Sequence, residues 1–163
     1  MRILVDADSM QRRLRTIIVR AAERYGLDVV FVSNSPVPVP EAPCVRSVIA
    51  DDADEWLVEN AAAGDLAITH DIPLAARLVR IGAEVITDRG DHLDEENIGE
   101  RSSERDLAME MREAGLLFTR GGGFGAREIQ AFANALDREL TARHRSSGGS
   151  TSGKGNGPVD KAE

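Results

Sequence analysis

The first eight residues, Met-Arg-Ile-Leu-Val-Asp-Ala-Asp, constrain the fold most strongly, because an apolar run ends in two carboxylates. A continuous apolar run bounded by polar residues is typical of a central strand that helices cover on both faces. In an open parallel sheet, ligands bind beyond the carboxyl ends of the strands. Asp6 and Asp8 are therefore expected at a functional edge, although an aspartate can also simply begin a helix.

Strand-like and helix-like segments alternate along the rest of the chain. Further strands are expected over residues 28–33, 44–50, 66–69 and 83–87. Helices are expected over residues 9–25, 51–63, 72–81, 94–99, 103–114 and 127–143, with a glycine loop at 121–125 before the last one. This order predicts an α/β domain with a mainly parallel five-stranded sheet and additional C-terminal helices.

Length and composition indicate one domain with a loose end. The 163 residues and 42% hydrophobic content suit a single core over residues 1–144. Residues 145–163 are rich in Ser and Gly, so we expect a disordered tail. Cys44 is the only cysteine, and no signal peptide or membrane-spanning stretch is recognised, which favours a cytoplasmic protein without a membrane partner.

The charge pattern limits how this chain could bind nucleic acid. A net charge of -8 argues against attraction by the whole surface, and the only lysines, Lys154 and Lys161, lie in the tail. Every basic side chain in the folded part is therefore arginine or histidine, and a divalent metal bound by carboxylates would reverse the local charge. The candidate phosphate-binding residues are Arg12, Arg13, Arg89, Arg105 and Arg127.

Acidic residues follow the expected carboxyl ends of four strands. They are Asp6 and Asp8, Asp51 and Asp54, Asp71, and Asp88. Crowded carboxylates raise one another's pKa and cost stability unless a cation compensates their charge. Mg²⁺ and Mn²⁺ are the hard cations that prefer oxygen ligands, so we expect one of them as the cofactor.

Several stretches of the sequence form recognisable motifs. They are Val5-Asp6-Ala7-Asp8, the helix start Asp51-x-Ala53-Asp54, the string from Gly64 through Asp71 to Ala75, Arg89-Gly90, Arg105-Asp106-Leu107, and the helix with Gln130-Ala131-Phe132. Together they resemble the YaiI/YqxD family, a bacterial family of uncharacterised proteins with a PIN-like fold, over about residues 1–140.

The resemblance implies a three-layer PIN-like domain with strand order 3-2-1-4-5. It also implies that Asp6, Asp8, Asp54 and Asp71 are the metal-binding and catalytic positions of a nuclease. Asn34, Asp51, Thr69 and Asp88 are candidates for the outer shell of that site. Such an enzyme would activate water with two metal ions to hydrolyse a phosphodiester, and PIN-family analogy suggests RNA as the partner.

Two other functions fit parts of the pattern. A non-catalytic PIN-like protein could retain the acids to bind a metal ion or nucleic acid, as the acidic surface would allow. A phosphatase of the haloacid dehalogenase type would use Asp6 as a nucleophile, with Asp8, Ser33 and Asp71 around it. That reaction needs a lysine to neutralise phosphate, and none precedes Lys154.

Overall fold

The computed structural model describes residues 1–113 and 124–161. Within these ranges, side chains are described up to residue 145, except those of residues 105, 108 and 110–113. The elements in chain order are β1 (Arg2–Asp6), the 3-10 helix η1 (Ala7–Ser9), α1 (Arg12–Tyr25), β2 (Asp28–Ser33), β3 (Val45–Ile49), α2 (Ala53–Asn60), β4 (Leu66–Ile68), α3 (Ile72–Ile81), β5 (Glu84–Ile86), β6 (His92–Leu93), α4 (Ile98–Glu113) and α5 (Ala126–Lys161).

The described strands form one mixed sheet in the order β3-β2-β1-β4-β5-β6. Strands β1 to β5 are parallel, as predicted, whereas β6 pairs antiparallel with β5. The predicted count of five strands was therefore wrong, because a two-residue strand is too short to show a period-2 pattern. The chain leaves β1 in one direction toward β2 and β3 and in the other toward β4 and β5, which makes the β1/β4 gap the switch point.

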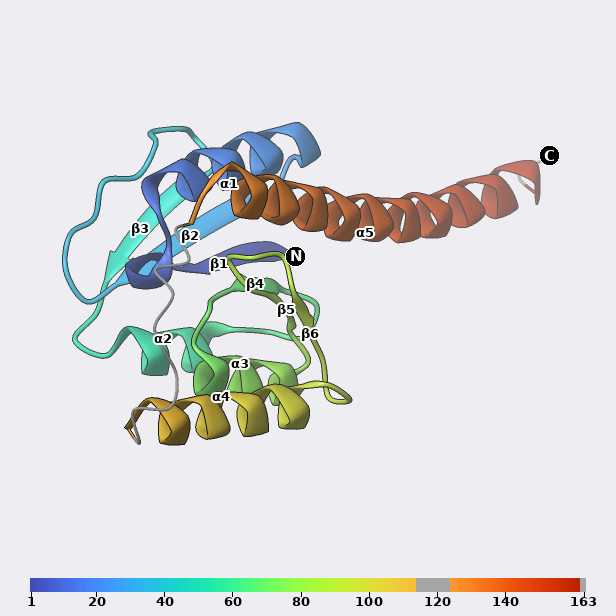
Figure 1. The fold of residues 1–163 in the computed structure, drawn as a ribbon. Coiled ribbons are helices and arrows are strands. Elements are labelled where there is room, and N and C mark those ends of the chain that lie inside the picture. Colours follow the sequence, from blue (N-terminus) through green and yellow to red (C-terminus); the bar gives the residue numbers. More distant parts are fainter. Residues whose placement is uncertain (114–123, 162–163) are drawn as a thin grey trace.

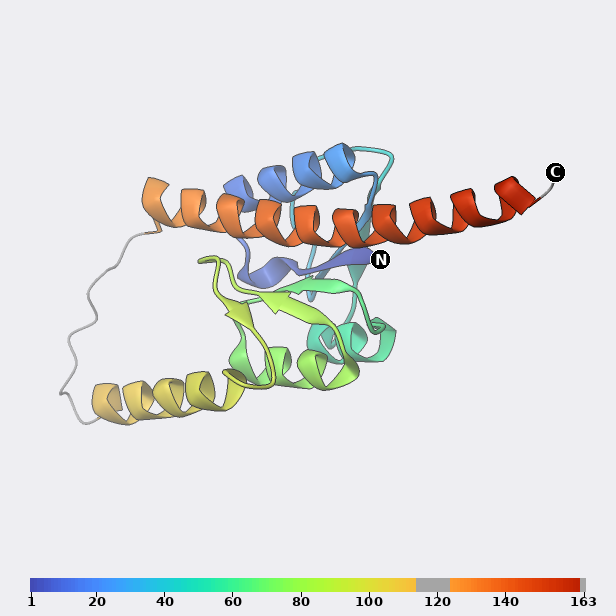
Figure 2. The same ribbon diagram turned by 90° about the vertical axis from the view of Figure 1, so that its right-hand side faces the viewer.

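Helices cover both faces of the sheet and create a three-layer domain. Figures 1 and 2 show α1 and α5 side by side on one face, and α2, α3 and α4 on the other. Alternate residues of β1 point to opposite layers: Ile3 and Val5 pack with the α1/α5 layer, and Leu4 packs with the α2/α3 layer. Because β1 has no exposed face, its only polar side chains sit at its ends.

Local hydrogen bonds explain where helices α3 and α4 begin. Helix α3 starts after Asp71, whose side chain accepts a hydrogen bond from the Leu74 amide, and it ends at Gly82 in a left-handed conformation. Its predicted range was confirmed. By contrast, the two short helices predicted over 94–99 and 103–114 are one helix, α4. It begins only at Ile98, because the Asp94 carboxylate accepts hydrogen bonds from the backbone amides of Glu96 and Asn97 in a preceding turn.

The turn between β5 and β6 packs tightly against α5. Gly90 has a φ of 89°, and a Cβ atom there would lie 2.6 Å from the Ala131 carbonyl oxygen. Only glycine combines that backbone conformation with so close an approach. The loop that carries Arg89 is therefore held against α5, while most of the predicted glycine loop (121–123) lies outside the described residues.

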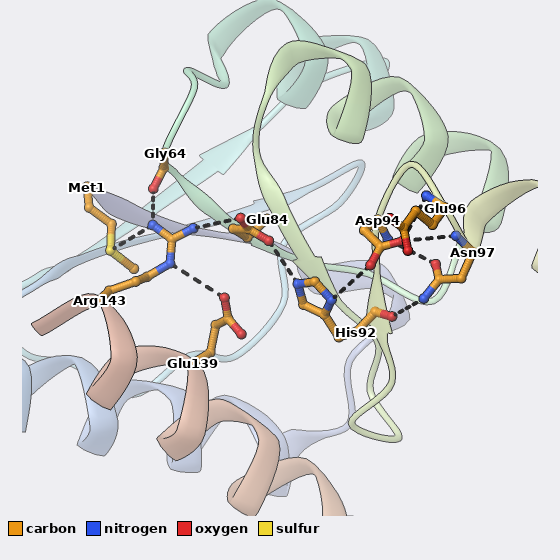
Figure 3. A network of polar contacts seen from close by, with 9 residues as sticks. All are labelled: Met1, Gly64, Glu84, His92, Asp94, Glu96, Asn97, Glu139 and Arg143. Atoms are coloured by element: carbon orange, nitrogen blue, oxygen red, sulfur yellow. Dashed lines mark hydrogen bonds and ion pairs between the residues drawn. The ribbon is translucent and has the colours of Figure 1, made fainter. Parts of the chain in front are cut away.

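At the amino edge of the sheet, where β1 to β5 begin, Arg143 connects α5 to the strands. Its guanidinium donates to the Gly64 carbonyl oxygen and lies 3.8 Å from Glu84 and 3.7 Å from Glu139 (Figure 3). His92 lies 2.8 Å from Glu84 on the same network. Beyond this contact α5 continues away from the domain (Figure 1), and the domain boundary at residue 144 stays a prediction.

Replacing Arg143 tests whether this network fastens α5 to the sheet. Arg143→Ala should lower the free energy of unfolding by about 1 kcal/mol, because two carboxylates lose their partner and the Gly64 carbonyl loses its donor. The matched control is Arg145→Ala, an exposed arginine on the same helix. Urea unfolding measures both variants, and equal stabilities would show that the network contributes nothing.

Candidate functional site

Asp6 ends the central strand β1 and is a buried carboxylate, with only 6% of its surface exposed. One of its oxygens accepts a hydrogen bond of 2.8 Å from the Thr69 hydroxyl, and its backbone carbonyl accepts one from Ser9. Burial raises the pKa of Asp6, the hydrogen bonds partly offset this, and the negative charge of Asp8 adds to it. The fold therefore holds a carboxylate where its charge is costly.

Thr69 links the ends of β1 and β4 across the switch point. Its hydroxyl has a single proton, which it donates to Asp6, and it accepts the Asp71 amide proton at 3.0 Å. Asp71 in turn uses one carboxylate oxygen to cap α3 through the Leu74 amide. One buried hydroxyl thus fixes Asp6 relative to Asp71, although the two lie 65 positions apart in the sequence.

Asp8 and Asn34 form a second link, between β1, β2 and α2. The Asn34 backbone amide donates to an Asp8 carboxylate oxygen at 2.8 Å. The Asn34 side-chain oxygen accepts from the Ala53 amide at 3.0 Å, which places the start of α2 beside the end of β2. Among the described residues, the second Asp8 oxygen accepts no hydrogen bond, and Asp8 itself is exposed.

Asp54 lies in the first turn of α2 and is half-buried. Burial raises its pKa, and the negative charges of Asp71 and Asp6 raise it further. Asp54 is therefore electrostatically part of the same group. Asp51 is exposed, and its charge is not among the causes of this shift.

Asp88 faces His70 at the same edge. Its carboxylate lies 3.4 Å from the His70 Nδ1 atom. The hydrogen bond to Asp88 is the largest cause that raises the pKa of His70, and the charges of Asp6 and Asp71 act in the same direction. His70 is thus a second cationic candidate at this edge besides the arginines.

The predicted arginines are free of carboxylate partners where their side chains are described. Arg12 and Arg13 are exposed in the first turn of α1, and Arg127 is exposed in the first turn of α5. Within the described residues, these three arginines and Arg89 all lack a carboxylate oxygen within 4.0 Å. Arg105 lies on α4, and its side chain is outside the described part.

The acidic edge, meaning Asp6, Asp8, Asp54 and Asp71, forms no described ion pair with an arginine or a lysine, although His70 acts on Asp6 from a greater distance. None of the four has an arginine or lysine nitrogen within 4.0 Å in the described structure. The amino edge differs, because Arg2 lies 3.0 Å from Asp65, which is buried to a similar degree as Asp6.

The four acids have the all-oxygen donor chemistry that suits Mg²⁺ or Mn²⁺. They are near one another without being gathered at ligand spacing. In the part of the chain that is described, the only three potential ligands with donor atoms within 4.8 Å of one another are Glu84, His92 and Glu139 (Figure 3). Those two glutamates are already paired with Arg143. The acidic edge therefore matches a hard cation in chemistry, and its side chains would have to approach one another to bind it.

This arrangement defines an α/β protein with an acidic site at the switch point of its sheet, without an arginine or lysine partner among the described residues. The family model described as "Uncharacterized BCR, YaiI/YqxD family" matches residues 4–142, so the chain belongs to that family. A UPF0178 protein of Pseudomonas entomophila is 45% identical over 148 residues, covering 86% of this chain and 97% of the relative. UPF0178 proteins of Trichlorobacter lovleyi and Myxococcus xanthus are 44% and 46% identical, covering 89% and 86% of this chain and 97% and 95% of the relatives.

Sequence reasoning missed several residues that the fold brings to the candidate site. His70 had no partner at ligand spacing in the sequence, and Ser9 was read only as the start of a helix. Phe124, the one aromatic residue in the glycine loop, was a signal that could have been used.

No described helix is long and apolar enough to cross a membrane.

The raised pKa of Asp6 predicts how stability changes with pH. In the folded state Asp6 holds its proton to higher pH than in the unfolded state, where the ordinary value is 3.8. The folded state thus binds more protons above that value, and this contribution to stability is lost as pH rises through the folded pKa. In EDTA at neutral pH, Asp6→Asn should therefore raise the melting temperature by a few degrees.

Asp65→Asn is the matched control, because Asp65 is equally buried but paired with Arg2. It should lower the melting temperature, since it breaks a hydrogen-bonded ion pair. Calorimetry from neutral pH down to about 4 measures both. If Asp6→Asn were destabilising at neutral pH, the carboxylate of Asp6 would be a stabilising group and the argument for an uncompensated charge would fail.

Proposed function

We propose that this protein is a metal-dependent nuclease that hydrolyses phosphodiesters at the acidic edge. The observation that carries the proposal is the buried Asp6 carboxylate, which Thr69 links to the Asp71 backbone and which has no arginine or lysine partner within 4.0 Å in the described residues. A fold keeps such a charge at a cost, and function is the usual reason. The position at the β1/β4 switch point is where ligands bind in sheets of this kind.

Asp6 and Asp71 are the proposed principal ligands of Mg²⁺ or Mn²⁺, with Asp8 and Asp54 beside them. Bound there, divalent ions would activate a water molecule, stabilise the leaving oxygen and supply the positive charge that the protein lacks. Thr69 keeps one Asp6 oxygen in place, and Asn34 does the same for Asp8. These two residues would orient the ligands without touching the substrate.

The family resemblance supports a PIN-like fold and RNA as the substrate class. The strand order β3-β2-β1-β4-β5 is the order that this resemblance implies. Of the arginines, Arg89 follows β5 at the same edge as the acids, and Arg12 and Arg13 follow β1 after the short helix η1. Their unpaired guanidinium groups would bind the phosphates on either side of the bond that is cut.

A covalent reaction has less support. No described serine, threonine or cysteine side chain is hydrogen-bonded to a histidine. In the phosphatase alternative, Ser33 would contact phosphate, yet it is 3% exposed and donates to the Ser35 carbonyl oxygen. Water is therefore the proposed nucleophile.

Metal binding can be assigned to one edge by calorimetric titration with Mn²⁺. Asp6→Asn and Asp71→Asn should each weaken binding at least about tenfold, because each removes a charged oxygen ligand. The Glu84, His92 and Glu139 group is the competing location, so His92→Gln serves as the control and should bind as tightly as the wild type. The opposite pattern would place the metal at the amino edge and contradict the proposal.

Activity can be tested by incubating the purified protein with single-stranded and structured RNA and DNA in Mn²⁺. Cleavage should occur and should fall by more than about a hundredfold in Asp6→Asn. Cleavage that persists in this variant would indicate a contaminating nuclease. Binding of Mn²⁺ without cleavage of any substrate would instead favour the non-catalytic PIN-like protein, which the spacing of the four acids also permits.

A further inference from the structure

A pocket of about 440 Å³ opens beside the acidic edge. Its wall includes His70 and Ile72, the two neighbours of Asp71 in the chain. The pocket therefore lies directly beside Asp71, one of the proposed metal ligands. Its volume lies in the range typical of sites that hold a molecule of nucleotide size.

Arg89 and Phe124 form one side of this pocket. The Arg89 guanidinium carbon lies 5.6 Å from the centre of the Phe124 ring, which is the arrangement of a cation–π contact. Phe124 is half-buried and packs against the core of the α1/α5 layer, so its ring is supported from behind. Gly90 fixes the backbone next to Arg89 against α5. The pair is thus a platform that combines a cation with an aromatic ring, and the fold holds it in place.

The two arginines of the pocket differ in their charge balance. Arg101 from α4 lies 3.4 Å from Asp91 and 4.0 Å from Glu104, so its charge is largely compensated. Arg89 has no carboxylate oxygen within 4.0 Å in the described part of the chain. An arginine without a close carboxylate partner, beside an aromatic ring, fits a ligand that is both planar and anionic.

The rest of the pocket offers polar groups of both kinds. The Asp88 carboxylate can accept hydrogen bonds from amino groups, and the neighbouring His70 ring can donate to carbonyl oxygens. Ile72 and Leu93 add apolar surface. These are the contacts that recognise the edge of a nucleobase, whereas an inorganic anion would need only the cation.

We infer that this pocket binds one unpaired nucleotide of a single-stranded nucleic acid, with its base against the platform that Arg89 and Phe124 form. The inference rests on the proposed function, because it names the part of the substrate that lies next to the cleavage site. Base stacking on aromatic rings and arginine planes is how proteins hold single strands. A base inside a duplex is covered on both faces by its neighbours and cannot enter such a pocket without being flipped out.

The test is a binding measurement in EDTA, where metal-dependent cleavage cannot occur. Fluorescence anisotropy compares a labelled short single-stranded RNA with the same sequence in a blunt duplex, and a single-stranded DNA shows whether the sugar matters. The single strand should bind about tenfold more tightly than the duplex, since one stacked base contributes on this scale. A competing nucleoside 5′-monophosphate should displace the strand if a free nucleotide also fits the pocket.

Substitutions at the platform test the contact directly. Phe124→Leu keeps the apolar packing but removes the ring, and Arg89→Ala removes the available cation; each should weaken single-strand binding about tenfold. Phe124→Trp, which keeps an aromatic ring at this position, should bind the single strand about as tightly as the wild type. The control is Arg46→Ala, an exposed arginine on β3 at the far side of the sheet, which should bind as the wild type does.

Each outcome separates this inference from the proposed activity. Equal binding of strand and duplex, or unchanged binding by Phe124→Leu and Arg89→Ala, would overturn the pocket assignment even if the protein cleaves RNA in Mn²⁺. Selective binding that the ring substitution abolishes, without any cleavage in Mn²⁺, would support the pocket and overturn the nuclease. The absence of all binding to strands and mononucleotides would overturn the inference.

Discussion

The structure depends on a carboxylate that ends a strand with no exposed face. Asp6 has hydrophobic layers on both sides of its strand and a neighbouring strand on each edge, so its charge cannot be fully hydrated. The Thr69 hydroxyl supplies one hydrogen bond and at the same time orders the start of α3 through the Asp71 amide. This interaction therefore sets the geometry of the switch point, and it leaves an electrostatic cost that burial and the nearby charge of Asp8 create.

The two edges of the sheet differ in whether their acidic residues are paired with arginine, and this difference supports a binding role for the acidic edge. At the amino edge, Arg2 pairs with Asp65 and Arg143 with Glu84. At the carboxyl edge, no described basic side chain lies within 4.0 Å of Asp6 or Asp71, while an unpaired Arg89 lies in the adjoining pocket. Separating acids from available arginines in this way suits a site where a cation and a phosphate bind next to each other.

Much of this arrangement could be predicted from the sequence, because local signals carried it. The apolar run before Asp6 and the Asp71 cap of α3 are local, and parallel strands bring their ends to one edge. Strand β6 was missed because two residues carry no pattern, and the amino-edge network was missed because Arg143 meets Glu84 only after α5 folds back. Distances between the acids depend on side-chain orientation, which spacing in the sequence does not encode.

The central claim is that Asp6 remains a buried carboxylate, despite the cost to stability, because it binds a divalent cation at the acidic edge. A crystal soaked in Mn²⁺ and measured near the manganese absorption edge would locate the ion by its anomalous scattering. The account predicts a peak between Asp6 and Asp71, with their carboxylate oxygens at coordination distance and Arg143 still on Glu84 and Glu139. A peak only at Glu84, His92 and Glu139, or none at a manganese concentration that saturates binding in solution, would contradict it.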